Sequence, residues 1–454
     1  MPFRLLSAMM VTVLVAACES PDKNPSGEKA LAINQTISQI ADQLDLWPGF
    51  DPMTVPLAIY TGKATWLFRH PSPPEDFAEL IVNGERVFRR EGRHPLVTSN
   101  TVRKLADSYT ATLLAHGEFG QASPAALAAT ALHESFHVHQ YTHHPDWVAN
   151  ETVLFIYPDD DPQLLALRRL ESIALERAVH GDEKEVACWT ARALEQREMR
   201  FADMAAEFMN YERELERLEG LGYYIEYKAL GKDQPRISDE ALAADEVRLR
   251  SARAGAVLAF ILDRLQPGWR ESLATKDDQY LDQLLTPAVK DADLSVCRFN
   301  DAEISAQQKV SRVDVEALAQ ARLSQFRTFE ELAGWRVTIL ASNEALLLRR
   351  FDPMNVERLK QGLLHVHKLA LGNDRGRLDM QAEARGELQA LTVSAGDHPL
   401  FEGVRELTVG GLSEPVIQQE DGGVSLETPG FTMKFKPARV KVDKARSQVT
   451  VALD

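Results

Sequence analysis

The pattern of apolar and polar residues divides the chain into three stretches with different periodicities. Near the N-terminus, apolar residues recur at helical spacing and predict a helix over 31–46, which Trp47-Pro48-Gly49 ends. Short apolar runs separated by turn residues then predict a small β-sheet. Its expected strands are 55–60, 64–68, 81–82, 86–88 and 108–114, with hairpin turns at Thr61-Gly62-Lys63 and Asn83-Gly84.

The second stretch, up to about residue 332, has helical periodicity. Ser123 predicts an N-cap and Pro124 the first position of a helix that runs to Tyr141 without an internal Gly or Pro. Asp161 and Pro162 begin another helix in the same way, and Gly181 ends it. The remaining predictions are long antiparallel helices over 182–230, a helix over 247–265, a loop over 286–304 and an amphipathic helix over 310–332.

The third stretch begins near Gly334 and has strand periodicity. Gly-Gly, Gly-Asn and Pro-Gly breakers separate its apolar runs, as in a small β-sandwich. His365 and His367 share one face of an expected strand and could bind a metal. Without a third donor nearby, we expect them to be surface residues. The expected strands are 336–340, 363–371, 406–409, 424–427, 432–436, 440–442 and 449–453, which gives an α+β fold class overall.

The first 18 residues have the composition of an export signal. Arg4 precedes an apolar run, Leu5 to Ala17, that is too short to cross a bilayer as a helix. The run ends Val15-Ala16-Ala17-Cys18, which resembles the lipobox of bacterial lipoproteins, although a signal peptide cut nearby is the alternative. A polar tether follows over 19–30. We therefore expect a cell-envelope protein that faces the periplasm and contacts the membrane only through a lipid anchor at Cys18.

The net charge limits the classes of partner that the chain can bind, and the cysteine content allows one disulfide. The 454 residues carry a formal net charge of −16 without a block of lysine or arginine, which argues against nucleic acid and anionic lipid as partners. Besides Cys18, the chain has only Cys188 and Cys297. In an oxidising compartment these two could form a disulfide, worth roughly 4–5 kcal/mol in the chain-entropy model. The sequence leaves that pairing open.

Two imidazoles stand one helical turn apart in the predicted helix that begins at Pro124. His133 and His137 occupy positions i and i+4, so both can direct a ring nitrogen at one ion. Glu134 would then lie beside the remaining, water-occupied position. This HExxH sequence is the pattern of zinc metallopeptidases. The alternative is that the two histidines are ordinary polar positions on a partly buried helix.

A catalytic zinc site needs a third protein ligand. No histidine follows at the HExxHxxGxxH spacing, so we expect His139 and His143 to support the site or to be loop residues, with His143 in the loop after the motif helix and ligation by His143 as an alternative. Glu219 is the preferred ligand, because Gly220 after it would let its helix approach the motif helix closely. The residues around it, 212–226, also fit a solvated helix face with Glu–Arg pairs. Two further glutamates stay open as ligands, Glu171 and Glu176.

The HExxH sequence followed by Glu219-Gly220-Leu221, with Tyr224 and Glu226 beyond, resembles the gluzincin clan, and specifically the M1-like "peptidase MA" group of envelope-associated metallopeptidases. The likeness covers about residues 50–285 and departs from the group at Gly222, where alanine is usual. It implies that His133, His137 and Glu219 bind Zn²⁺. It also implies a zincin-like unit, in which a small sheet beside the motif helix offers an edge strand to the substrate backbone.

The resemblance implies a zinc-dependent peptidase that hydrolyses a peptide or protein substrate. Zinc would lower the pKa of a water molecule and polarise the scissile carbonyl. Glu134 would be the general base and Gln140 would orient a histidine ligand. Tyr223 or Tyr224 would stabilise the oxyanion, although both also fit the core. The competing class is a non-catalytic envelope lipoprotein that uses the scaffold for binding or assembly, and Glu134 argues against it because a purely structural site has no use for that carboxylate.

These expectations give a five-part organisation. Residues 1–18 are a lipoprotein signal peptide and 19–30 a flexible tether. Residues 31–120 form the N-terminal α/β part of the catalytic unit, 121–332 a helical metallopeptidase domain and 333–454 the C-terminal β domain.

Overall fold

The computed structural model describes residues 25–276 and 278–453, so the expected signal peptide, including Cys18, lies outside the described part. The chain is α+β, as expected. Its described residues separate into two compact units, one with residues 25–145 plus 225–232, and one with 146–224 plus 233–276 and 278–453. None of the helices in the described residues has the length and apolarity needed to span a bilayer.

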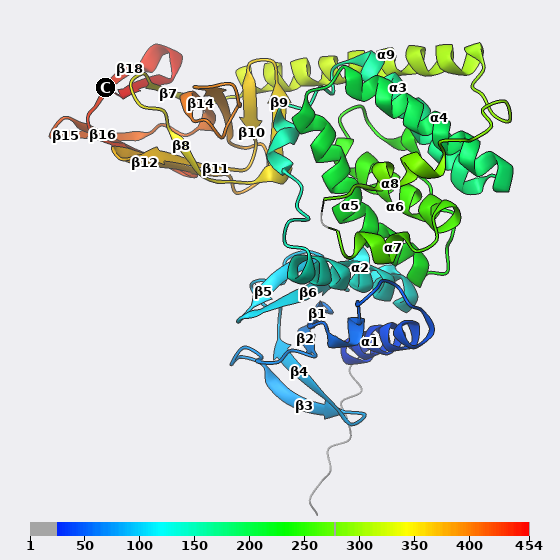
Figure 1. Cartoon of the computed structure of the whole chain (residues 1–454). Coiled ribbons are helices and arrows are strands. Elements are labelled where there is room, and N and C mark those ends of the chain that lie inside the picture. Colours follow the sequence, from blue (N-terminus) through cyan, green and yellow to red (C-terminus); the bar gives the residue numbers. More distant parts are fainter. Residues whose placement is uncertain (1–24, 277, 454) are drawn as a thin grey trace, which may run out of the picture. The chain divides into compact units, whose positions relative to one another are not determined.

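The first unit is a six-stranded sheet with two helices, and its strand order is β3-β4-β2-β1-β6-β5 (Figure 1). Both expected hairpins are confirmed, and residues 83 and 84 take the positive φ angles that an Asn-Gly turn requires. The strand missed by the periodicity, β5, pairs only with β6 and exposes Arg103 and Lys104, charges that are typical of a sheet edge. The strands are β1 (Leu57–Tyr60), β2 (Ala64–Phe68), β3 (Ala78–Val82), β4 (Glu85–Glu91), β5 (Thr101–Leu105) and β6 (Ser108–Leu114).

The two helices of this unit are α1 (Pro25–Gln43) and α2 (Pro124–His143). Since α1 begins at Pro25, the last six residues of the expected tether are helical. The motif helix α2 packs against α1, β5 and β6, and Phe136 sets its ring edge-on to Trp47 and Phe50, with centroids 5.4 and 5.3 Å away. The expected boundary at 120/121 therefore differs from the structure, because α2 belongs with the N-terminal sheet.

The second unit begins with a group of helices. The Asp161 side chain accepts from the backbone N–H groups of Gln163 and Leu164, as expected of an N-cap, and Gly181 ends the same helix. Cys188 and Cys297 form a disulfide with Cα atoms 6.0 Å apart. The helices are α3 (Pro162–His180), α4 (Glu183–Ala202), α5 (Ala206–Ala229), α6 (Val247–Leu265), α7 (Trp269–Leu273), α8 (Leu281–Ala288) and α9 (Asp301–Glu330), and the last residues of α5 belong to the first unit.

Helices α5 and α6 touch backbone to backbone. A Cβ atom on Gly220 would lie 2.6 Å from the Cα of Gly255, and one on Gly255 would lie 2.2 Å from the carbonyl oxygen of Glu216. Only glycine allows this approach. The expectation that Gly220 serves contact with the motif helix is wrong, since its close neighbour is α6.

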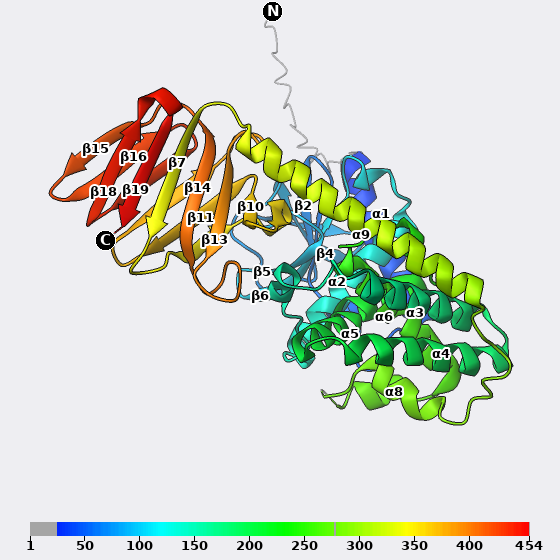
Figure 2. The same ribbon diagram turned by 90° about the horizontal axis from the view of Figure 1, so that it is seen from above.

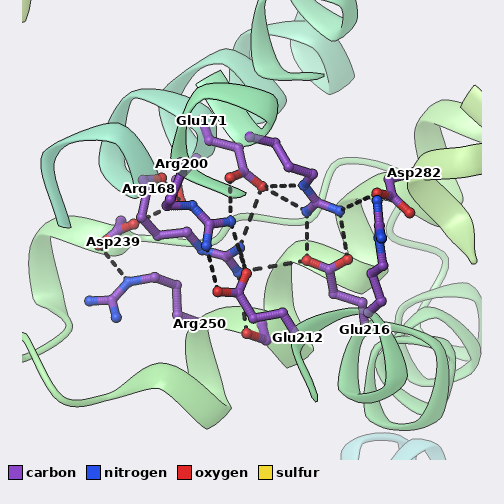
Figure 3. A network of polar contacts seen from close by, with 12 residues as sticks. Arg168, Glu171, Arg200, Glu212, Glu216, Asp239, Arg250 and Asp282 are labelled. Carbon is purple, nitrogen blue, oxygen red and sulfur yellow. Dashed lines mark hydrogen bonds and ion pairs between the residues drawn. The ribbon is translucent and has the colours of Figure 1, made fainter. Parts of the chain in front are cut away.

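Helices α3, α4 and α5 enclose a network of buried charges (Figure 3). Glu171 accepts from Arg197 and Arg200, Glu212 from Arg168 and Arg200, and Glu216 from both terminal nitrogens of Arg197. Burial alone would raise the pKa of Glu171, but Arg197, Arg168 and Arg200 hold it well below the usual range. Burial raises the pKa of Glu216 to about 7 although Arg197 and Arg168 act to lower it. The network therefore fixes the register of α5 against α3 and α4.

The long helix α9 lies along α3 and leads into the C-terminal sheets (Figure 2). Two sheets, with strand orders β18-β19-β7-β14-β13-β10-β9 and β15-β16-β17-β12-β11-β8, share one apolar core, as expected of a sandwich. Their strands are β7 (Trp335–Ala341), β8 (Leu347–Phe351), β9 (Val356–Leu359), β10 (Gly362–His365), β11 (Lys368–Asn373), β12 (Gly376–Gln381), β13 (Gln389–Ser394), β14 (Val404–Leu412), β15 (Val416–Glu420), β16 (Gly423–Thr428), β17 (Phe431–Phe435), β18 (Ala438–Asp443) and β19 (Gln448–Leu453).

The expected strand 363–371 is instead two strands, β10 and β11, that belong to different sheets. His365 ends β10 and is fully buried, so the expectation of a surface residue is wrong. Its Nε2 lies 3.2 Å from the Thr392 hydroxyl, and burial lowers its pKa to about 3. His367 lies outside β10, and its Nδ1 is 2.6 Å from a carboxylate oxygen of Asp352. Different partners thus hold the two histidines.

Candidate metal centre

Helix α2 brings the HExxH residues together as expected. The Ser123 hydroxyl accepts from the N–H of Ala126 and Pro124 occupies the first turn, so both predicted start signals are confirmed. The side chains of His133, Glu134 and His137 lie below the surface, with 6, 9 and 6% exposure. Buried polar groups of this kind need specific partners.

The two histidines point at one place. Their Nε2 atoms are 2.9 Å apart. The Nδ1 of His137 donates to Oε1 of Gln140 at 2.7 Å, and the Nδ1 of His133 lies 3.3 Å from Oε2 of Glu226, which can only accept. Each Nδ1 thus faces an oxygen acceptor, which leaves the Nε2 of each ring directed at the other. Two ring nitrogens that converge in this way suit a shared cation.

The third expected ligand, Glu219, joins the same group. One carboxylate oxygen of Glu219 and one ring nitrogen each of His133 and His137 all lie within 4.8 Å of one another. Glu219 is on α5, seven residues before Glu226, so the two carboxylates share one face of that helix. Glu219 also accepts from Arg248 at 2.8 Å.

The support that Glu226 gives to His133 is the feature that sequence reasoning did not assign. The signal was present, since Glu226 closes the EGLxxYxE stretch at a spacing that returns to the face of Glu219. Gln140, in contrast, contacts His137 as expected from its position one turn later. Partners of this type fix the tautomer and orientation of metal-binding histidines.

The rival carboxylates are occupied elsewhere. Glu171 is 1% exposed and belongs to the network of Arg197 and Arg200, and Glu176 accepts from the backbone N–H groups of Ile237 and Ser238 at 2.6 and 2.7 Å. Neither belongs to the His133 group, the one metal-type cluster found among the described residues. The structure therefore favours Glu219 over both alternatives.

The other histidines of α2 face away from this group. His143 stacks on His139 with ring centroids 4.3 Å apart, and its Nδ1 donates to the carbonyl of His139. Burial, with the neighbouring His143 and His144, lowers the pKa of His139 to about 4. His143 is not part of the cluster of possible ligands. It is the last residue of α2, whereas the sequence placed it in a loop.

The two tyrosines expected near the oxyanion have different positions on α5. Tyr224 is fully buried, and its hydroxyl donates to the carboxylate of Asp263 at 2.9 Å. Its ring packs against Phe260 and Trp269, so the expected oxyanion role of Tyr224 is wrong and its core role is confirmed. Tyr223 is half-buried and lies four residues after Glu219, on the helix face of that ligand. Its oxyanion role stays a prediction.

Strand β5 is the sheet edge beside α2. It pairs with β6 on one side only, and both strands pack against the motif helix. An extended peptide could add to this free edge by backbone hydrogen bonds. Comparisons of the chain with protein-family models, with curated proteins and with solved structures found no match.

Proposed function

We propose that the chain is a zinc-dependent peptidase of the gluzincin type, anchored through Cys18 in a bacterial cell envelope and facing the periplasm. The observation that carries the proposal is the convergence of the His133 and His137 Nε2 atoms, 2.9 Å apart, while both Nδ1 atoms donate to oxygen. Metal-binding histidines commonly have this arrangement, in which one ring nitrogen faces the metal and the second donates to a fixed acceptor. The lipid anchor is inferred from the lipobox alone.

The donor set fits zinc. Two Zn–N bonds of about 2.0–2.1 Å at a tetrahedral angle separate their nitrogens by about 3.3 Å, close to the observed spacing. His133 and His137 with Glu219 would supply two nitrogens and one oxygen, the set found in several catalytic zinc sites. When bound, zinc would lower the pKa of a water molecule and polarise a carbonyl group.

Glu134 would be the general base. It follows His133 on the helix, is almost fully buried, and carries the carboxylate that this reaction requires. It would take the proton of the attacking water and pass it to the leaving amine. Tyr223 would donate to the oxyanion, and the free edge of β5 would hold the substrate backbone in a zincin-like arrangement.

The first test replaces Glu134 by Gln. We expect Glu134→Gln to lower peptide hydrolysis at least 10²–10⁴-fold, because the general base is lost, while bound zinc stays near one per chain. Hydrolysis is measured on a broad peptide library and zinc by elemental analysis. Purified wild type that carries no zinc, and that hydrolyses nothing after zinc is added, would refute the peptidase. The better hypothesis would then be a non-catalytic envelope lipoprotein that uses the scaffold for binding or assembly.

A second test separates the carboxylate ligands. Glu219→Ala should remove most bound zinc from the folded protein. The folded fraction of Glu171→Ala should bind about as much zinc as wild type, since Glu171 lies in the arginine network. Zinc is measured per folded chain after gel filtration. The reverse order would transfer the ligand role to Glu171.

A further inference from the structure

A cavity of about 360 Å³ opens in the first unit beside the HExxH sequence. Its volume falls within the range of roughly 300–1,000 Å³ that is usual for ligand pockets. The residue before β5, the loop before α2, the first two turns of α2 and the C-terminal part of α5 each contribute to its wall. The lining residues are Asn100, Glu118, Ala122, Ala126, Leu127, Thr130 and Glu226.

Two of these residues connect the cavity to the candidate metal centre. Thr130 lies one helical turn before His133 and Glu134 on α2. Glu226 lines the cavity and also lies 3.3 Å from the Nδ1 of His133. The cavity begins at Asn100, directly before the edge strand β5. A side chain of a peptide paired with β5 would therefore enter it close to the scissile bond.

The lining combines an aliphatic wall with carboxylates. Ala122, Ala126 and Leu127 are apolar, while Glu118 and Glu226 are acidic, and no basic residue lines the cavity. Lys29 contacts the loop before α2 by donating to the carbonyl of Gly120, but it is not a lining residue. A long aliphatic stem that ends in a cation matches this combination.

We propose that the cavity binds the side chain of a lysine or arginine next to the scissile bond, and that Glu118 determines this preference. The inference rests on the proposed peptidase function and names its substrate class. Glu118 is exposed at the mouth of the cavity and takes no part in holding the histidines. Its carboxylate can therefore accept a charge-assisted hydrogen bond from the substrate.

The test compares matched peptides on the zinc-loaded full chain. The peptides are acetylated and amidated, so that a single lysine side chain is their only positive charge. Each peptide carries this lysine at a different position and is compared with the same peptide that has glutamine there. We expect wild type to prefer lysine at one position by about tenfold in kcat/KM, and Glu118→Gln to remove most of that preference. Asp107→Asn is the matched control, because it removes one exposed charge from the β5–β6 turn of the same unit.

A binding measurement separates this inference from the catalytic proposal. In the Glu134→Gln background, affinity for the lysine peptide should exceed that for the glutamine peptide, and adding Glu118→Gln should equalise them. Wild type that hydrolyses peptides without a lysine or arginine preference, or a Glu118→Gln variant that behaves like Asp107→Asn, overturns the cavity assignment and leaves the peptidase standing. Absence of both hydrolysis and peptide binding overturns both.

Discussion

The histidine group on α2 and the arginine–glutamate network on α3 to α5 are both buried and polar, yet their interactions differ in kind. In the network, Glu171, Glu212 and Glu216 each accept from a guanidinium group, so opposite charges compensate one another. In the histidine group, two ring nitrogens approach each other to 2.9 Å, and their outer nitrogens are fixed by Gln140 and Glu226. The network pairs opposite charges within the protein, whereas the histidine group brings two ring nitrogens together, which is the basis of the proposed cation site.

The difference shows how to distinguish structural from functional burial. Glu171, surrounded by arginines, has its pKa held low and stabilises the fold only together with its partners. A histidine whose Nδ1 is held by an acceptor and whose Nε2 faces a second Nε2 has a defined ring direction, which a core residue does not need. Mutations in the two regions should therefore change different observables.

The largest effect is expected in the network. Glu171→Gln should lower the free energy of unfolding by about 3–5 kcal/mol, because it leaves buried guanidinium charge without its carboxylate. Urea or thermal unfolding measures it, with Glu195→Gln as the control. Glu195 forms an exposed ion pair with Arg192 on α4, and its loss should cost less than about 1 kcal/mol. Equal effects of the two substitutions would mean that the network is not a stabilising element.

A smaller effect, and on another observable, is expected at the histidine group. Glu226→Ala should weaken zinc affinity about 10–100-fold, because the His133 ring loses the acceptor that orients it. Competition with a chelator measures the affinity. Glu226→Gln, which keeps an acceptor oxygen, should recover part of it. A fall in stability with unchanged zinc affinity would show that Glu226 belongs with the structural carboxylates instead.

The comparison also explains what the sequence could predict. Local signals gave the capped helices α2 and α3, both hairpins and the i, i+4 spacing of His133 and His137, since each depends on residues a few positions apart. The contacts of Glu171 and Gly220 could not be predicted in the same way. Arg197, Arg200 and Gly255 come from other helices, and only the packed structure brings them close. The sequence likewise predicted one continuous strand where the structure has β10 and β11, because apolar periodicity does not show where the chain passes from one sheet to the other.

The smallest effect tests whether the start of α2 belongs to the stability of the fold or to the site. Ser123→Ala removes the hydroxyl that accepts from Ala126 N–H and should cost about 1 kcal/mol of unfolding free energy. His133 lies ten residues farther along, and its ring is held by Glu226, so zinc affinity should be unchanged. Ser123→Asp, which keeps a capping oxygen, should restore the stability. A zinc affinity that falls with Ser123→Ala and returns with Ser123→Asp would mean that the helix start positions the histidines as well.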